Sequence, residues 1–439
     1  MSSKTTLRLL AAAAGASLLL ASCGGGTAET PPADGTATIA FWSWNPDEVS
    51  AKPYLAAFEA AHPKIKVRHR FVQYSDYANT TQLALQSGSG PDVFGLQVGA
   101  LTKQFAPLAD DLGPVAAEKL GAEWKSKLLA ADQLAVDGKQ VALPWMVTGG
   151  GLVWSNQTLL KELGLSVPKT LAEMEPFCAK VKAAGKHCMV QGAKDSWQNI
   201  DVYQAIANQL APGKFYQAMK GEASFTDPAF VQAFEIWKQF FDRGIFPEGA
   251  LAMTAYPDAN DAFKKGQAAL IAFGTWQNSD TTTERLKQYQ ETYGADFNVK
   301  TFFQPHFFPA VADGATTGHL FGGPDVGFAV SARSSQKEAA RTFVTWLTAS
   351  EDGQKLMAKS VQQPALASVP LDLSDVASPE QVTALKEQEP ALQKLIGQRE
   401  IDHADVRTAL GDALSSVASS QQSAADAAAA VQRAIESSR

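Results

Sequence analysis

The chain has 439 residues, of which 45% are hydrophobic and 19% are charged, so it is long enough for two or three domains with cores of their own. Its 38 basic and 45 acidic side chains give a formal net charge of −7. A mildly acidic chain is a poor electrostatic match for nucleic acid or anionic lipid, so we expect neither as a partner.

The first 22 residues are typical of an export signal. Lys4 and Arg8 precede an apolar run over 9–21, which is too short to span a membrane and has the length of a signal-peptide core. The run closes on Leu-Ala-Ser before Cys23, which resembles the lipobox of bacterial lipoproteins. That resemblance implies cleavage before Cys23, acylation of its sulfur and a location outside the cytoplasmic membrane. The alternative is an ordinary secretory signal with an incidental cysteine.

Residues 23–37 predict a lipidated cysteine followed by a flexible tether, because they contain many Gly and Pro residues and no hydrophobic period. Order begins at residue 38. Two helices alternate with three strands there, at 38–42 (strand), 53–61 (helix), 65–71 (strand), 75–86 (helix, with Ser75 as its cap) and 93–97 (strand). This order indicates a parallel α/β unit, in which ligands meet the carboxyl ends of the strands.

Further elements predict a second α/β region. Asp137-Gly138 marks the turn of a hairpin over 133–143. Strands are expected at 188–190, 268–273 and 326–330, and helices at 171–184, 202–210, 228–243 and 337–348. The Ala- and Ser-rich tail over 409–435 carries an apolar stripe, so we expect helices rather than disorder there.

Two cysteines remain after the anchor, Cys178 and Cys188. An even pair in an oxidising compartment is compatible with a disulfide. Two buried thiols that pack a helix onto the next strand are the alternative.

Six short motifs follow one another in an order that resembles the bacterial extracellular solute-binding protein family 1, the binding subunits of ABC importers. They are Phe41-Trp42-Ser43-Trp44, Tyr74 with Tyr77, Ser87-Gly88-Ser89-Gly90-Pro91-Asp92-Val93, Gly138-Lys139 with Leu143-Pro144 and Trp154-Ser155-Asn156, Pro168-Lys169-Thr170, and Phe263-Lys264-Lys265-Gly266 with Gly274-Thr275-Trp276. The chain departs from the family pattern at Trp154, where tyrosine is commoner. The likeness covers nearly the whole chain after the tether.

The resemblance implies an α/β fold of the periplasmic-binding-protein type II, in which two Rossmann-like lobes are joined by a hinge of three chain crossings. We expect the amino-terminal lobe to contain residues 38–148 and 275–324, and the carboxy-terminal lobe residues 149–274 and 325–439. The crossings are expected near 147–152, 273–275 and 323–327, where glycines would let a few dihedral angles absorb the motion. Tight turns are the alternative use of these glycines.

The resemblance further implies a monomeric receptor with no chemistry of its own, which captures a mono- or oligosaccharide and delivers it to the transmembrane permease of an ABC importer. Two alternatives stay open. One is a lipoprotein that presents its ligand to a sensory membrane kinase, and the other is a polysaccharide-degrading lipoprotein.

Ligand residues are expected at the carboxyl ends of strands, since sugars offer apolar faces to aromatic rings and polar edges to amides and carboxylates. Trp44, Asn45 and Gln97 are chosen on this ground. Trp145 and Thr148 are chosen because they lie on the expected first crossing, and Asp325 because it lies at the expected third crossing and could accept from sugar hydroxyls. The resemblance adds Trp276, as the family's aromatic platform, and Trp197, Gln198 and Asn199, in a loop that faces ligand. Core packing is the alternative for Trp44, a solvated amide for Gln97, packing between lobes for Trp145 and helix capping for Asp325.

Signatures of catalysis are absent from the sequence. The six histidines form no His-Glu-x-x-His, and neither a Gly-x-Ser-x-Gly nor a phosphate-binding loop with its lysine occurs. We therefore expect no catalytic residues, metal or cofactor. A pair of carboxylates needs no such signature, which keeps a glycosidase open.

Overall fold

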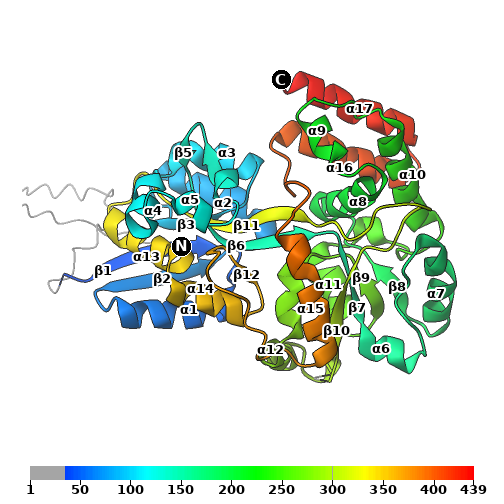
Figure 1. The fold of residues 1–439 in the computed structure, drawn as a ribbon, viewed down its shortest axis with the longest axis horizontal. Helices are drawn as coiled ribbons and strands as arrows, with labels where there is room; N and C mark the ends of the chain where they lie inside the picture. The colour runs from blue at the N-terminus through cyan, green and yellow to red at the C-terminus, as the bar shows by residue number, and fades with distance from the viewer. Residues whose placement is uncertain (1–34, 299) are drawn as a thin grey trace, which may run out of the picture.

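The computed structural model describes residues 35–298 and 300–439. The predicted signal peptide, Cys23 and most of the predicted tether lie outside these residues. Two groups of elements lie side by side, each around its own sheet (Figure 1). The blue and cyan group is the amino-terminal lobe, and the mainly green group, with the red helices, is the carboxy-terminal lobe.

The amino-terminal lobe contains a six-stranded sheet of order β12-β6-β11-β3-β1-β2. Its strands are β1 (Ala37–Ser43), β2 (Ile65–Phe71), β3 (Val93–Leu96), β6 (Leu143–Gly150), β11 (Phe321–Val330) and β12 (Gln363–Pro364). Its helices are α1 (Glu48–Ala61), α2 (Tyr74–Ser87), α3 (Ala100–Phe105), η1 (Ala106–Leu108), α4 (Gly113–Leu120), α5 (Trp124–Lys127), η2 (Ala131–Leu134), α13 (Lys337–Ala349) and α14 (Glu351–Lys359). A small hairpin of β4 (Ala135–Val136) and β5 (Lys139–Gln140) turns at the predicted Asp137-Gly138.

The carboxy-terminal lobe contains a four-stranded sheet of order β10-β7-β9-β8. Its strands are β7 (Leu152–Asn156), β8 (His187–Val190), β9 (Ala268–Ile271) and β10 (Phe303–Phe307). Its helices are α6 (Gln157–Glu162), α7 (Leu171–Ala183), α8 (Ser196–Leu210), α9 (Lys214–Met219), α10 (Pro228–Asp242), η3 (Ala250–Ala252), the π-helix η4 (Ala255–Ala259), α11 (Asn260–Lys264), η5 (Thr275–Thr281), α12 (Thr283–Tyr293), η6 (Gly294–Asp296), α15 (Pro379–Leu392), α16 (Ala404–Ala418) and α17 (Ala424–Ser437).

The predicted α/β unit at the start of the ordered chain is confirmed, since β1 pairs in parallel with both β2 and β3. Gly88 ends α2 in a left-handed conformation (φ 80°), which glycine adopts without steric cost. The predicted cap Ser75 is wrong, because α2 begins one residue earlier and Gln73 precedes it without a side-chain capping bond.

The alanine-rich tail is helical as predicted, and it forms α16 and α17. Leu410 and Leu414 of α16, with Val431 and Ile435 of α17, are buried in the core of the carboxy-terminal lobe. Trp237 on α10 donates its indole N–H to the carbonyl of Leu414 at 2.9 Å. The apolar stripe therefore folds as helices because α8 and α10 supply the surface that buries it.

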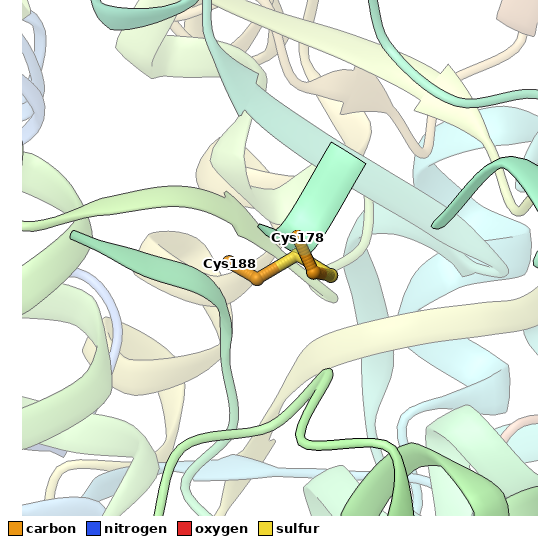
Figure 2. The surroundings of a disulfide bond; sticks show 2 residues. All are labelled: Cys178 and Cys188. Atoms are coloured by element: carbon orange, nitrogen blue, oxygen red, sulfur yellow. A yellow bond between two sulfur atoms is a disulfide. The ribbon is translucent and has the colours of Figure 1, made fainter. Parts of the chain in front are cut away.

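Cys178 on α7 and Cys188 on β8 are joined by a disulfide (Figure 2). The bond ties the helix to the strand that follows it. This agrees with the disulfide interpretation rather than with a pair of free thiols.

Strand pairing corrects the predicted lobe boundaries. β10, within 275–324, pairs with β7 in the carboxy-terminal sheet. α12, just before it, packs in the same core cluster as both strands. In the other direction, β11 pairs with β3 and β6 in the amino-terminal sheet, and α13 packs against β11 and β6. Residues 325–364 therefore belong to the amino-terminal lobe, and most of 275–320 to the other.

The chain crosses between lobes three times, but not at all of the predicted places. It leaves the amino-terminal lobe where β6 ends and returns along β11, near two predicted crossings. At 273–275 it only approaches the amino-terminal lobe and turns back into α12. The third crossing follows β12, over 365–378, before α15 packs against β10.

Candidate functional site

Trp276 lies at the junction of the two lobes, on η5 just after β9. Its indole N–H donates to the hydroxyl of Tyr256 at 3.2 Å. A Cβ on Gly274 would lie 2.2 Å from the ring of Trp276 and 2.4 Å from the carbonyl oxygen of Gly149, so only glycine lets the two segments approach this closely. The glycine before the predicted platform thus sets the position of the ring.

Three further aromatic rings of the carboxy-terminal lobe surround Trp276. Trp197, in the first turn of α8, is stacked with Tyr256 and Phe273 at interplanar angles of 14° and 18°. Its centroid lies 6.1 Å from that of Trp276, with the rings nearly edge to face. The lobe therefore presents a cluster of flat apolar surface at the junction.

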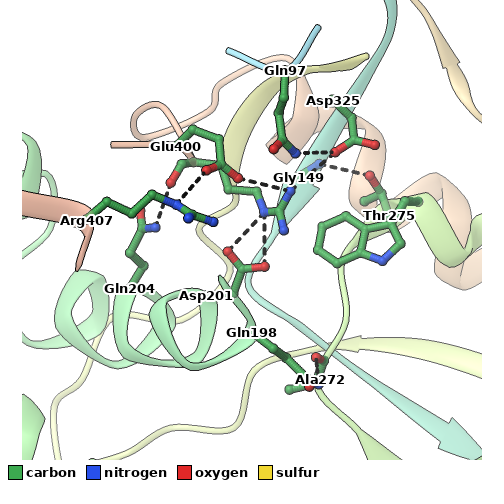
Figure 3. Close-up of polar contacts among 12 residues, drawn as sticks. Gln97, Gly149, Gln198, Asp201, Gln204, Ala272, Thr275, Asp325, Glu400 and Arg407 are labelled. Atoms are coloured by element: carbon green, nitrogen blue, oxygen red, sulfur yellow. Dashed lines mark hydrogen bonds and ion pairs between the residues drawn. The ribbon is translucent and has the colours of Figure 1, made fainter. Parts of the chain in front are cut away.

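Arg399 extends into this cluster from the segment between α15 and α16. Its guanidinium carbon lies 4.4 Å from the ring centroid of Trp276 and 5.3 Å from that of Trp197. Its Nε donates to both carboxylate oxygens of Asp201 at 3.0 Å, and Nη1 lies 3.3 Å from Asp325 Oδ1 (Figure 3). The side chain is only 9% exposed.

The amino-terminal lobe contributes a chain of polar contacts to the same place. Tyr74 donates its hydroxyl to Gln97 Oε1 at 2.7 Å. Gln97 Nε2 in turn lies 3.4 Å from Asp325 Oδ1 (Figure 3). The ring of Trp44 packs edge to face on Tyr74 and Tyr77. A continuous set of contacts therefore runs from Trp44 across the junction to Trp276.

Negative charge prevails slightly in the cluster, because Asp201, Asp325 and Glu400 lie around Arg399 and Arg407. Burial raises the pKa of Asp201 to about 6, although the charge of Arg399 opposes the rise. Burial also raises the pKa of Asp325. Both carboxylates are therefore ready to accept hydrogen bonds but lack full solvation.

A small cavity lies against Trp276. It is lined by Asp201 of α8, by Phe273 and Gly274 after β9, and by Gly150 at the end of β6. Backbone from the first crossing and side chains from the carboxy-terminal lobe thus meet in its wall.

The structure brings together four of the residues predicted from sequence, namely Gln97, Trp197, Trp276 and Asp325. Trp44 is connected to them through Tyr74, and Asn45 follows Trp44 in a half-buried position. Asp325 does not cap a helix, because it lies in β11 at an irregularity of the pairing with β6.

Four other predicted residues are buried within the lobes. The ring of Trp145 packs on Tyr54 and Phe328 in the amino-terminal core, and Thr148 is 1% exposed in β6. The predicted loop at 197–199 is instead the first turn of α8. Gln198 accepts from the N–H of Gly192 and donates to the carbonyl of Ala272, so it holds backbone together.

Asn199 has a similar structural role. Its side chain accepts from Gln191 and donates to the carbonyl of Ala193. Both amides therefore use their donors and acceptors within the chain, as most buried polar groups do.

Sequence reasoning missed Asp201 and Arg399. Asp201 follows Trp197 by four residues on α8, so both side chains lie on the same face of the helix. A helix predicted to begin at Ser196 would have indicated this. Arg399 lies in a segment with neither helix nor strand, where no periodicity signals its direction. Only the tertiary fold places it beside the indoles.

Among the described residues, no group of three His, Cys, Asp or Glu side chains is arranged to hold a metal ion. In the same part of the chain, no helix combines the length and the apolar character needed to cross a membrane.

Residues 43–354 match the bacterial extracellular solute-binding proteins. The chain belongs to this family. Its members work outside the cytoplasm. The matched region begins at the end of β1 and runs into α14, so it includes the aromatic cluster and the first two crossings.

Relatives and solved structures agree with this family. The chain is similar to the alpha-glucosides-binding periplasmic protein AglE of Rhizobium meliloti, with 29% identity over 248 residues, or 52% of each chain. The match thus spans about half the length of this relative. The fold is similar to a chitin oligosaccharide binding protein (TM-score 0.75, 19% identity, 92% of this chain and 99% of the other). It is also similar to maltose-bound MalE3 of T. maritima (TM-score 0.72, 20% identity, 91% and 99%). The fold is accordingly that of the type II periplasmic binding proteins.

Proposed function

We propose that this protein captures a mono- or oligosaccharide between its lobes and delivers it to the permease of an ABC importer. The main support for the proposal is that two indoles and three polar side chains lie close together at the junction of the two sheets. They are Trp197, Trp276, Gln97, Asp201 and Asp325. Indole faces suit the apolar face of a sugar ring, and carboxylates and amides suit its hydroxyls. The printed names of the similar proteins, which refer to alpha-glucosides, chitin oligosaccharides and maltose, favour the same ligand class.

The proposed ligand residues are Trp44, Asn45, Gln97, Trp197, Trp276 and Asp325, with Asp201 and Tyr74 added. Trp145, Thr148, Gln198 and Asn199 are left out, because the ring of Trp145 packs in the amino-terminal core, Thr148 is 1% exposed in β6, and both amides bond within their own lobe. Micromolar affinity corresponds to about 8 kcal/mol. Stacking on two indoles and several charge-assisted hydrogen bonds can supply this once closure of the lobes excludes water.

Opening and closing would bend the chain at the end of β6, within β11 and after β12. Gly151 has a φ of 99°, a conformation open to few other residues, and it follows β6 directly. The receptor works as a monomer without catalysis, so the ligand leaves chemically unchanged.

A thermal-shift screen tests the ligand class. Maltose, maltotriose, diacetylchitobiose, xylobiose and sucrose are added singly to the purified protein. At least one should raise the melting temperature, because a ligand that binds only the folded state stabilises it. Mass spectrometry should recover that sugar intact. Conversion of any sugar, or no shift across a wide carbohydrate panel, would refute the proposal.

A lipid on Cys23 would hold the receptor at the outer face of the membrane. The full-length chain, expressed in a bacterial host, should fractionate with membranes and gain mass from acyl chains. The Cys23→Ser variant should lose both properties. Equal membrane retention and no added acyl mass in either protein would show that Cys23 carries no lipid anchor.

A further inference from the structure

Residues 393–403, the strap, join α15 to α16 and run across the junction of the lobes. The strap's Arg399 carbonyl accepts from the side chain of Gln204, on α8 of the carboxy-terminal lobe, at 2.8 Å. Its Gly397 carbonyl accepts from the N–H of Gly322 in β11 at 2.8 Å, and its Ile401 carbonyl accepts from the N–H of Ala100 in α3 at 3.3 Å, both in the amino-terminal lobe. The strap thus touches both lobes beside the proposed sugar site.

The guanidinium of Arg399 lies where a stacked sugar ring would have to lie. It stands 4.4 Å from the centroid of Trp276, so it covers one face of the proposed platform. Its donors are directed to Asp201, Asp325 and Glu400 of its own chain. Because the residue is 8% exposed, little of it remains for a ligand to contact.

The surroundings of this guanidinium form a site for a flat cation. Two indoles offer negative faces, at 4.4 and 5.3 Å, and two carboxylates accept hydrogen bonds within 3.3 Å. We call Trp197, Trp276, Asp201 and Asp325 the cage. In the structure, the chain fills the cage with its own side chain.

We infer that Arg399 is an internal occupant of the cage and a specificity-determining residue, which a ligand must displace to reach Trp276. The inference rests on the proposed function and deepens it. Once Arg399 withdraws, Asp201 and Asp325 lose their ion pairs, and Glu400 keeps the one with Arg407. The emptied cage then favours neutral sugars and amino sugars with an ammonium group, and it rejects uronates and sugar phosphates.

The strap's lack of regular structure allows the withdrawal. No helix or strand is formed over 393–403, so moving Arg399 does not break a helical or sheet ladder. The ion pair with Asp201 is buried, and replacing it by ligand hydroxyls on the same carboxylate avoids leaving that charge unpaired.

The first experiment fills the vacated cage with a small molecule. Arg399→Ala is titrated with methylguanidinium chloride at millimolar concentrations while tryptophan emission is recorded. Binding should be at least tenfold tighter than to the unsubstituted protein. Arg341→Ala is the matched control, since Arg341 donates to Asp110 at 2.6 and 2.9 Å in the amino-terminal lobe, away from the indoles. A folded Arg399→Ala variant that takes up no more methylguanidinium than this control overturns the inference.

The second experiment uses sugars. For a neutral disaccharide that binds the unsubstituted protein, Arg399→Ala should bind about tenfold more tightly, and methylguanidinium should compete with the sugar. The glucosamine disaccharide should bind to the variant more tightly than digalacturonate does. Weaker binding of neutral sugar by the variant would make Arg399 a direct ligand contact and overturn the inference.

Two precautions keep the outcomes distinct. If the alanine variant does not fold, sugar affinity is measured on Arg399→Gln instead, whose side chain can still donate to Asp201. Uptake of methylguanidinium by Arg399→Ala, without a response of any variant to any sugar, would support the cage and refute the carbohydrate proposal.

Discussion

The hydroxyl oxygen of Thr275 accepts a hydrogen bond from the backbone N–H of Gly149 at 2.9 Å. Gly149 lies in β6, the strand that leaves the amino-terminal lobe, and Thr275 directly precedes Trp276 (Figure 3). The carbonyl of Trp276 also accepts from the side chain of Gln362, next to β12, at 3.0 Å. The proposed platform is thus fastened to the crossing strand and to the amino-terminal lobe, so its position depends on how the lobes are arranged.

Thr275→Val removes the acceptor while keeping the shape of the side chain. The buried N–H of Gly149 would lose its partner, so we expect the free energy of unfolding to fall by about 1–3 kcal/mol. Urea denaturation followed by circular dichroism measures this. Thr342→Val is the control, because its hydroxyl bonds the carbonyl of Glu338 at the surface of α13, and it should change stability by less than about 0.5 kcal/mol. Equal losses in the two variants would contradict a special role for the Thr275 bond.

Trp276→Ala should weaken binding of whichever sugar gives the largest thermal shift by ten- to a hundredfold, about 1.4–3 kcal/mol, because the stacking surface is lost. Isothermal titration calorimetry measures the affinity. Trp42→Ala serves as the comparison, since the ring of Trp42 stacks on the Arg70 guanidinium at 4.3 Å and takes no part in the cage. Unchanged affinity in Trp276→Ala would remove this ring from the site.

The sequence predicts those helices and strands whose apolar positions repeat clearly with the period of the element, but it does not predict β10, α12 or α15. The helix expected over 337–348 is α13, and its Phe343, Val344 and Leu347 face the core as their spacing indicates. The lobe to which a strand belongs cannot be predicted in this way. Nothing local in β10 says that its partner is β7 rather than a strand of the other sheet, because pairing is a choice between distant segments.

The site was predictable in part for the same reason. Gln97 directly follows β3, so strand order brings it to the junction, whereas Trp276, on η5, is predicted from the resemblance to the family. The resemblance predicts Trp197 in a loop, whereas α8 begins at Ser196 and gives it a helical position. Arg399 depends entirely on the path of the strap, which packing against Gly322 and Ala100 decides.

The disulfide between Cys178 and Cys188 closes a short loop, with a sequence separation of 10. A loop of this length restricts the unfolded chain by about 3 kcal/mol in the chain-entropy description. We expect Cys178→Ala with Cys188→Ala to lower the free energy of unfolding by about that amount, as measured by urea denaturation. The unsubstituted protein treated with dithiothreitol should lose a similar amount. A loss below about 1 kcal/mol in both samples would show that the bond adds little.

His306 on β10 makes stability depend on pH. Its Nε2 lies 2.9 Å from the hydroxyl of Ser155 on β7, and burial lowers the pKa of its imidazole to about 4. In the unfolded chain the imidazole has its ordinary pKa near 6.5. The unfolded state therefore binds the extra proton between about pH 6.5 and 4, and the contribution of neutral His306 is complete above pH 6.5 and is lost as the pH falls through this window.

The expected loss is at most about 3 kcal/mol between pH 7 and pH 4, in excess of any loss shared with His306→Gln, whose side chain does not titrate. Urea denaturation of the two proteins at half-unit pH steps gives the difference directly, because the carboxylates common to both cancel. His187→Gln, at an exposed position of β8, controls for the removal of an imidazole from the same lobe. If the curves of the unsubstituted protein and His306→Gln ran parallel from pH 7 to 4, burial of His306 would not be the source of the pH dependence.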